Sequence, residues 1–565
     1  MLGEADNNTA TDASGSITNV QEQGVDEGDI VKAHGEYLIV LSRGRLFSVK
    51  VRDGETALLT PVFKGPAYPE GFTDGTWYDE LLVSDDTIVV VGYSYAISAT
   101  QVGIFDFAAD GTITHRESFF IDSNDYYSSR NYASRLVDGK LIFYMPYYFS
   151  VYADERDNLT YNFPQIRHWT ENNDTTEPED IINATDIYKP VQTDTPTLHM
   201  LVTCDLANAV TCTAKGVLGP YARNYYVSPA SVYLWVSDTE NYYAATDETS
   251  TAEPNAYVYT MPLDGSGVGV VKAYGVPIDQ FSFKETVDGY LNVLVQEYGS
   301  GDAMWWSQGD ISTKLALVRF PLSLFSKDPV TINSDYYRVL PEPETSYYSL
   351  QNRFVGDYLV YGAGEGWFET PTTNTVYVVN YPNATIPVEE VVLESGVDRI
   401  EVLDSEHAVV VGSAKEDLVF TWLGLTTKPV TQVDSYKLAN ASQGETRSHG
   451  FFYSSAEQML GLPIRTGGNN YGWEELYDAS AEVLFLSLAD NKFTALGSLT
   501  GSTSESSFDD KCKFSCTDWY GNSRPIFYDD RIFALMGYDL VEGNVSRDTI
   551  TEVQRINIFE TSQND

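Results

Sequence analysis

The stretch Ser134-Arg-Leu-Val-Asp-Gly-Lys-Leu-Ile-Phe-Tyr144 places a tight polar turn, Asp138-Gly139, in front of a short apolar run. Such a turn supplies the positive φ that a two-residue hairpin requires, and the run is typical of a strand. The arrangement returns along the whole chain of 565 residues, with turns near residues 35, 86, 139, 230, 289, 357, 405 and 530. Stretches with a helical period are scarce, so the sequence predicts an all-β protein.

Further strand-like runs follow each hairpin, and a ninth, degenerate hairpin spans Arg447 to Ile464. Four antiparallel strands per unit, repeated in tandem, predict a β-propeller, because only neighbours in a closed circle can cover the exposed face of each sheet. Propellers typically have four to eight blades. We therefore expect a single β-propeller of about eight four-stranded blades, with a range of about seven to nine.

The two chain ends are expected to meet in one blade. Residues 523–528, 531–536 and 551–559 supply three strands of the last unit, and Ile17-Thr-Asn-Val-Gln21 is expected to supply the fourth. This shared blade would close the ring without a free sheet edge. The propeller is then predicted over residues 17–562, after a flexible N-terminal tether at 1–16 and with a polar insertion at about 154–196.

Composition narrows the classes of function. Hydrophobic residues make up 43% of the chain, which excludes global disorder. Asp and Glu number 81 against 35 Lys and Arg, so the formal net charge of −46 argues against nucleic-acid binding. No stretch approaches the roughly 20 apolar residues of a transmembrane segment. So acidic a surface suits a salt-rich or calcium-rich setting, or simply a soluble secreted protein.

The four cysteines form two local pairs, Cys204 with Cys212 and Cys512 with Cys516. Neither pair has the further Cys or His ligands that a zinc site needs, so we predict two structural disulfides. Disulfides indicate an oxidising compartment. Together with the polar first residues, they predict a mature exported protein without its signal peptide, which is secreted, periplasmic or at the cell surface.

The stretch Thr18-Asn-Val-Gln-Glu-Gln-Gly-Val-Asp-Glu-Gly-Asp-Ile-Val-Lys32 resembles the opening motif of secreted proteins with a C-terminal β-propeller domain, distantly related to WD40 repeats. Residues 134–141, 280–282, 448–451, 460–464 and 523–524 are similar to further pieces of that family, in the same order. The resemblance implies the propeller fold and export. It implies no catalytic residues, because the family is defined without an assigned reaction.

Three carboxylates of this motif, Asp26, Glu27 and Asp29, lie within four residues. With carbonyl oxygens from a neighbouring loop they could chelate a hard cation, and Ca²⁺ is the candidate cofactor. The alternative is that they close the first blade by accepting hydrogen bonds from backbone amides. Both interpretations stay open at the level of the sequence.

Basic residues recur shortly before the predicted turns, on the strand expected next to the central axis: Lys32, Arg135, Lys284, Arg353, Arg399 and Arg524. Several cations around one axis would form an anion-binding channel for carboxylate, sulfate or phosphate groups. The alternative is that each cation pairs with an acidic neighbour and fixes the packing of the blades.

Two further groups are candidates for binding or chemistry. Trp305 and Trp306 lie in a glycine-rich loop, where they would stack on a sugar or a protein partner, or cover a blade edge. Arg447, His449 and Tyr453 lie together in the degenerate hairpin. An arginine that neutralises a uronate, with His or Tyr as the base, would suit a polysaccharide lyase.

No motif of a known catalytic class is present, and the chain has only six histidines. The leading hypothesis is therefore an exported, non-enzymatic propeller that acts as a binding scaffold for a protein, cell-envelope or glycan partner, with calcium assistance. The alternative is an extracellular lyase or hydrolase that acts on an anionic polysaccharide.

Overall fold

The computed structural model describes residues 16–73, 75–125, 133–149, 151–153, 159–170, 174–188, 196–206, 210–222, 224–237, 254–297, 314–343, 350–364, 374–466, 482–502, 510–518 and 521–560. Strands predominate, which confirms the all-β prediction. None of the helices within these ranges has the length and apolar character of a membrane span. The described helical segments are 3₁₀ helices of three residues each: η1 (Ala184–Asp186), η2 (Gln280–Ser282), η3 (Leu322–Leu324), η4 (Ser334–Tyr336), η5 (Ser448–Gly450) and η7 (Ala489–Asn491).

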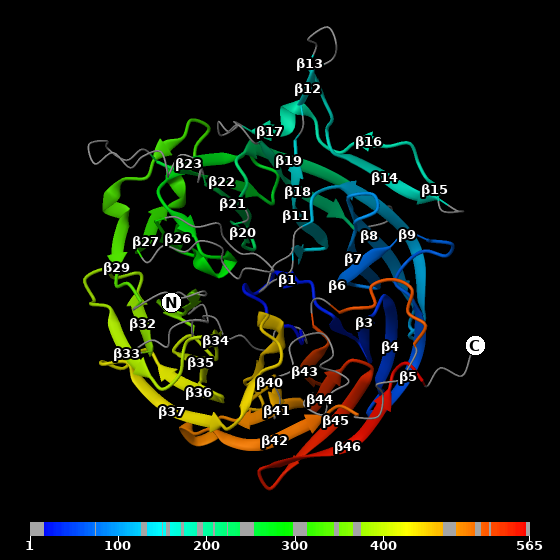
Figure 1. Ribbon diagram of the computed structural model, residues 1–565, viewed down its shortest axis with the longest axis vertical. Coiled ribbons are helices and arrows are strands. Elements are labelled where there is room, and N and C mark those ends of the chain that lie inside the picture. Colours follow the sequence, from blue (N-terminus) through cyan, green and yellow to red (C-terminus); the bar gives the residue numbers. More distant parts are fainter. Residues whose placement is uncertain are drawn as a thin grey trace, which may run out of the picture.

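The strands form successive antiparallel sheets, in each of which four strands follow one another along the chain. Figure 1 shows these sheets arranged around a common centre, with the first strand of each innermost. From the inner strand outward, the first three sheets are β2 to β5 (Val31–His34, Tyr37–Ser42, Arg45–Asp53, Thr56–Pro66), β6 to β9 (Thr76–Ser84, Thr87–Ser94, Ala99–Phe107, Ile113–Asp122), and β10, β11, β18 and β19 (Ser134–Val137, Lys140–Tyr148, Thr197–Asp205, Thr211–Gly219).

Three further sheets continue around the same centre. They are β20 to β23 (Asn224–Val227, Ser231–Ser237, Ala256–Pro262, Gly269–Ala273), β25, β26, β27 and β29 (Phe283–Thr286, Tyr290–Gln296, Leu315–Pro321, Tyr337–Leu340), and β30 to β33 (Leu350–Val355, Tyr358–Ala363, Asn374–Asn380, Glu389–Leu393). Two short strands extend them: β24 (Val276–Pro277) also pairs with β26, and β28 (Val330–Thr331) pairs in parallel with β23.

The last three sheets return to the start of the circle. They are β34 to β37 (Arg399–Val402, His407–Ala414, Asp417–Gly424, Thr431–Leu438), β39 to β42 (Phe452–Ser454, Met459–Thr466, Glu482–Ser487, Thr494–Thr500) with β38 (Ala441–Gln443) also on β40, and β43 to β46 (Ser523–Tyr528, Arg531–Met536, Asp539–Ser546, Thr549–Asn557). The described residues thus form nine sheets of at least four strands.

The predicted hairpin turns join the first and second strands of their sheets. β10 and β11, for example, are joined by Asp138 and Gly139, whose φ angles of 47° and 72° are positive as the turn requires. The degenerate hairpin at 447–464 also belongs to a full sheet, because β39 pairs with β40 across residues 455–458. Its inner strand begins only at Phe452, since residues 448–450 form the 3₁₀ helix η5.

Residues around the predicted insertion at about 154–196 extend the outer edges of two sheets. β12 (Val151–Ala153) and β13 (Leu159–Tyr161) pair with each other. β14 (Gln165–Thr170) adds to β9 and also pairs with β15 (Asp174–Thr175) and β16 (Glu179–Asp180). β17 (Ile187–Tyr188) runs parallel to β19. β14 and β17 thus cover outer edges that would otherwise be open to pairing with another chain, whereas β12 and β13 form a separate two-stranded sheet.

The predicted blade shared by the two chain ends is wrong. The last sheet takes all four strands from the C-terminal part of the chain, and residues 17–21 lie in no strand. The strand that was not predicted is β45, whose Glu542-Gly543-Asn544 stretch has turn-forming residues although it pairs with β46 throughout, the extra residue of the register shift being Val553 on β46. With β45 present, the sheet has no position left for an N-terminal strand.

The core consists of apolar clusters between neighbouring sheets. Leu82 and Val102 of one sheet pack with Phe143 and Met200 of the next, and eight further clusters join other pairs in the same way. One of them joins the first sheet to the last, where Val40 and Phe47 meet Phe533. Burying each such side chain contributes roughly 1.5–3 kcal/mol, so contacts between sheets hold the fold together.

Both predicted disulfides are confirmed. Cys204 and Cys212 lie opposite each other on β18 and β19. Cys512 and Cys516 lie in residues 510–518, here called the clasp, which joins the first two sheets to the approach of the last. Asp510 of the clasp accepts a hydrogen bond from Arg43, and Phe514 packs against Tyr68 with ring centroids 5.0 Å apart.

A charged centre and a candidate binding pocket

Residues 16–29, here called the central segment, cross the space that the inner strands enclose (Figure 1). Part of the segment, β1 (Asp26–Glu27), pairs with β10. Asn19 reaches the opposite side, where its Nδ2 donates to the Ser448 carbonyl at 3.1 Å. Gln21 donates to the Gln280 carbonyl at 2.8 Å. The segment therefore connects inner strands that are far apart in the sequence.

Glycines allow the central segment to turn and to approach its neighbours closely. Gly24 has a φ of 83° and lies in a turn where the Val25 amide donates to the Glu22 carbonyl at 3.1 Å. At Gly28 a Cβ atom would lie 2.7 Å from the Ser134 Oγ and 2.8 Å from the Glu80 Oε2. A side chain at that position would push the segment away from β6 and β10.

The carboxylates of the central segment face cations of the inner strands. Glu27 accepts from His449 Nε2 at 2.8 Å and lies 3.7 Å from Arg135 Nε. Burial alone would raise the pKa of Glu27, but the charge of Arg135 and the hydrogen bond from His449 outweigh it and lower that pKa to about 2. Asp29 accepts from Arg524 Nε at 2.9 Å, and its pKa is likewise lowered despite burial.

The six cations predicted to form an anion-binding channel do gather at the centre, and each meets a carboxylate of the chain itself, Lys32 with Asp26 among them. Arg353 and Arg399 both pair with Glu401, at 2.9 and 2.8 Å, and Lys284 pairs with Glu22 at 2.9 Å. The carboxylates and cations of this central charge network are Glu22, Glu27, Asp29, Glu401, Glu445, Arg135, Lys284, Arg353, Arg399, His449 and Arg524. These contacts favour the alternative of pairing with acidic neighbours over the channel.

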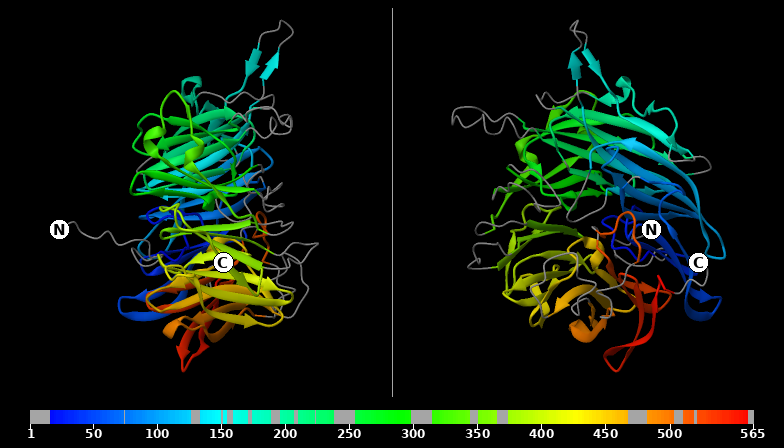
Figure 2. Two further views of the ribbon diagram at one scale, coloured as in Figure 1. Left: turned by 90° about the vertical axis from the view of Figure 1, so that its left-hand side faces the viewer. Right: turned by 45° about the vertical axis from the view of Figure 1, so that its right-hand side comes forward.

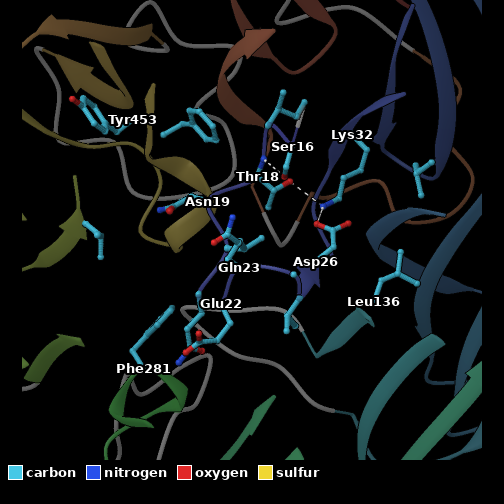
Figure 3. Close-up of a pocket in the computed structure, with 18 of the residues that line it drawn as sticks. Ser16, Thr18, Asn19, Glu22, Gln23, Asp26, Lys32, Leu136, Phe281 and Tyr453 are labelled. Atoms are coloured by element: carbon cyan, nitrogen blue, oxygen red, sulfur yellow. Dashed lines mark hydrogen bonds and ion pairs between the residues drawn. The ribbon is translucent and has the colours of Figure 1, made fainter. Parts of the chain in front are cut away.

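The same contacts argue against the predicted calcium site. Asp26 faces Lys32, with Oδ1 and Nζ 2.7 Å apart (Figure 3). Glu27 accepts from His449 and Asp29 accepts from Arg524, and His449 Nδ1 also lies 3.9 Å from Asp29. Carboxylates engaged by protein side chains in this way do not leave their oxygens free to coordinate a metal ion. Across the part of the chain that the structure describes, no group of three or more His, Cys, Asp or Glu side chains could hold a metal.

The three residues of the predicted lyase site do not share one cavity. His449 is buried in the central charge network, on Glu27, and Arg447 lies 3.5 Å from Glu445. Tyr453 instead lines the pocket described next, and burial raises its pKa, as does the nearby Asp404. The alternation that would have aligned Arg447 with His449 is absent, because η5 occupies that stretch. Trp305 and Trp306 lie outside the described residues.

A pocket of about 440 Å³ opens above the central segment (Figure 3). The inner strands of seven sheets reach it, through β2, β6, β10, β25, β30, β34 and β39, at the ends that carry the short first turns. Residues 16–26 complete the lining on the remaining side. Because so many sheets contribute, the shape of the pocket depends on the whole arrangement rather than on one loop.

Aromatic and aliphatic side chains give the pocket its chemistry. Phe281, Phe354 and Phe452 line it, together with Val402 and Leu136. The Arg353 guanidinium lies 3.8 Å from the centre of the Phe281 ring while it pairs with Glu401, so its charge is compensated. The pocket can therefore take apolar groups. The sequence analysis missed these phenylalanines, although two of them stand beside conspicuous motif residues: Phe354 follows Arg353 and Phe281 lies within the 280–282 piece.

Comparisons with known proteins address the fold. The family model described as the β-propeller domain matches residues 15–319. No curated protein matches the chain. Among solved structures, a chimera of ACO and RPE65 is 10% identical, with 65% of this chain and 90% of that chain covered and a TM-score of 0.26. Cobalt-substituted Synechocystis ACO is also 10% identical, with 69% and 86% covered and a TM-score of 0.24.

Proposed function

Since the chain belongs to the β-propeller domain family, we propose that its nine sheets are the blades of one closed ring, and that this ring is an exported, non-enzymatic binding scaffold. The apolar cluster between the first and last sheets supports closure, and so does the clasp. Apolar packing between the first and last sheets, together with the clasp, would then close the ring, instead of a blade shared by the two chain ends. Nine blades agree with the degenerate ninth hairpin at 447–464.

The pocket of about 440 Å³ is the observation that carries the binding role. A rigid site lined by phenylalanines loses little conformational freedom when a partner enters, so most of the burial of apolar surface contributes to affinity. The charges around the pocket are already compensated, as at Lys284 and Glu22. We therefore propose an apolar segment of a protein partner as the ligand, in preference to an anionic glycan.

Binding is favoured over the lyase alternative because the three residues of that predicted site do not share one cavity. His449 is held by Glu27 inside the central charge network, away from the pocket. An imidazole held there has no path to a substrate in the pocket, which general acid–base catalysis requires. Export is supported by the two disulfides, which take up all four cysteines of the chain.

The proposal is tested with a variant that fills the pocket. Random peptides displayed on phage would be selected on the immobilised full chain, and the enriched peptides measured against Val402→Trp. Val392→Trp is the matched control, since Val392 is 64% exposed on the outer strand β33. We expect binding to Val402→Trp to be at least tenfold weaker, and binding to the control to be unchanged.

Two results would overturn the proposal. Peptides that bind Val402→Trp as tightly as the unmodified chain would show that the pocket is not the binding site. Release of unsaturated uronate from alginate, ulvan or pectin, followed by its absorbance, would show a lyase instead of a scaffold.

A further inference from the structure

A second, smaller cavity lies farther along the strands that approach the central pocket. Its volume is about 50 Å³, and it lies between the sheets that begin with β6 and β10. Val83 of β6 lines the central pocket, whereas Asp79 and Glu80 of the same strand line the small cavity. The lining residues with polar groups include Asp79, Glu80, Thr100, Asn124 and Asp125.

A β-bulge shapes this cavity. The pairing of β6 with β7 shifts between Tyr78 and Glu80, so Asp79 is an extra residue without a partner on β7. Bulges turn a side chain away from the regular alternation and are common beside functional sites. Gly92 opposite the bulge permits the close approach, since a Cβ there would lie 2.2 Å from the Trp77 carbonyl oxygen.

The two neighbouring carboxylates differ in their partners. Glu80 accepts hydrogen bonds from the Ala133 and Ser134 amides, both at 3.0 Å. Asp79 is only 7% exposed, and within the described residues it makes no hydrogen bond and no ion pair within 4 Å. A buried carboxylate in that state carries a large desolvation penalty, which a bound cation would offset.

The surroundings of Asp79 are negative. Burial raises its pKa well above the usual range, and the charges of Glu80 and Asp125 raise it further. Arg447 is the cation whose charge opposes this shift, and Arg447 is itself engaged with Glu445. The formal net charge of −46 also draws cations toward the surface.

The geometry points to a site for an alkylammonium group, such as a lysine side chain or a polyamine, with the Asp79 carboxylate as its counter-ion. A volume of about 50 Å³ exceeds the roughly 10–15 Å³ that a cavity needs to hold one water molecule, and so suits a compact ammonium head. An ammonium has three donors, which Asp79, Thr100 and Asn124 can accept. A calcium ion is disfavoured, because among the described residues no group of three or more His, Cys, Asp or Glu side chains converges as a metal site requires.

Two exposed tyrosines adjoin residues that line the cavity, and we expect them to contact the alkyl chain. Tyr95 donates from its hydroxyl to Asp125, and the Tyr148 amide donates to Asn124, so both tyrosines adjoin residues that line the cavity. Their exposed fractions are 55% and 59%. Aromatic rings next to a carboxylate attract organic cations by both electrostatic and apolar contact. The site goes beyond the proposed scaffold role, because it lies in a separate cavity.

Titration calorimetry of the full chain with n-butylammonium chloride tests this site, with sodium chloride at the same ionic strength as the reference. We expect saturable binding that Asp79→Asn weakens at least tenfold. Asp86→Asn is the matched control, because Asp86 is an exposed aspartate in the turn just after the C-terminal end of β6. The control should bind as the unmodified chain does.

A thermal-shift measurement keeps the test independent of folding defects. Butylammonium should raise the melting temperature of the unmodified chain and of Asp86→Asn, but not that of a folded Asp79→Asn. Equal binding by Asp79→Asn, or no binding beyond that of sodium, would overturn the proposal. Spermidine and a lysine-containing peptide then distinguish the two sources of the ammonium group. Tighter binding of spermidine identifies a polyamine as the ligand, and tighter binding of the peptide identifies a lysine of a partner protein.

Discussion

The central segment and the clasp both join distant parts of the chain through carboxylates, yet the pKa values of Glu27 in the first and Asp518 in the second are shifted in opposite directions. Glu27 in the central segment has a pKa lowered to about 2, because Arg135 and His449 outweigh the effect of burial. Asp518 in the clasp has a pKa raised to about 6, because burial outweighs the hydrogen bond from the Arg43 amide. A cation that bonds directly to the carboxylate outweighs burial, as it also does at Asp510 of the same clasp, which accepts from the Arg43 guanidinium and has a pKa lowered to about 2.

Removing a cation from the central charge network should have the largest effect. Arg524→Met leaves Asp29 and Glu445 buried without the guanidinium that lies 2.9 and 3.4 Å from them. We expect the free energy of unfolding to fall by about 3–5 kcal/mol, as is found when one partner of a buried ion pair is removed. Urea unfolding, followed by tryptophan fluorescence, measures the loss.

Arg555→Met is the control for this comparison. Arg555 pairs with Asp539 and Glu552 at the outer rim, where 25% of its side chain is exposed. Its removal should cost about 1 kcal/mol or less, because exposed ion pairs contribute little. Equal losses for the two variants would show that the central network is no more important to stability than the rim.

The pH dependence of the unfolding free energy should distinguish Glu27 from carboxylates that have an ordinary pKa. Its pKa is lower in the folded state than the usual 4.5, so its contribution is complete above about pH 4.5 and is lost as the pH falls toward 2. The contribution is of order 3 kcal/mol. Unfolding free energies from pH 6 to pH 2 should therefore fall less steeply for Glu27→Gln than for the unmodified chain. Parallel profiles would contradict this assignment.

Local sequence signals predicted the repeating part of the fold well. The two residues of a turn such as Asp138-Gly139 determine its local backbone conformation. Cysteines only eight or four residues apart can be paired from their spacing alone. The strand β45 was not predicted because its Glu542-Gly543-Asn544 stretch has turn-forming residues in place of a β-branched or aromatic run. The degenerate hairpin at 447–464 belongs to a sheet of at least four strands like the others.

From the sequence, the residues of the central charge network could be predicted, but not which of them pair with each other. The cations before the turns and the carboxylates near residue 27 were both identified, but their pairing joins residues 422 and 495 positions apart, as in His449 with Glu27 and Arg524 with Asp29. No local pattern specifies such a contact. The pocket was missed for the same reason, since its lining comes from the inner strands of seven sheets and each contributes one to three residues.

The smallest expected effect is the opposite pH dependence of the clasp. A folded-state pKa of about 6 for Asp518, against the usual 3.8, means that the folded chain holds this proton more tightly than the unfolded chain does. Stability from this group is therefore complete below about pH 3.8 and declines as the pH rises to 6, the reverse of Glu27. Asp518→Asn should remove this decline, so the difference in unfolding free energy between variant and unmodified chain should change steadily from pH 4 to pH 6. The side chain is partly exposed, and solvent screening should keep the change well below that of Glu27. A difference that stays constant across this range would show that Asp518 is ionised in the clasp as it is in water.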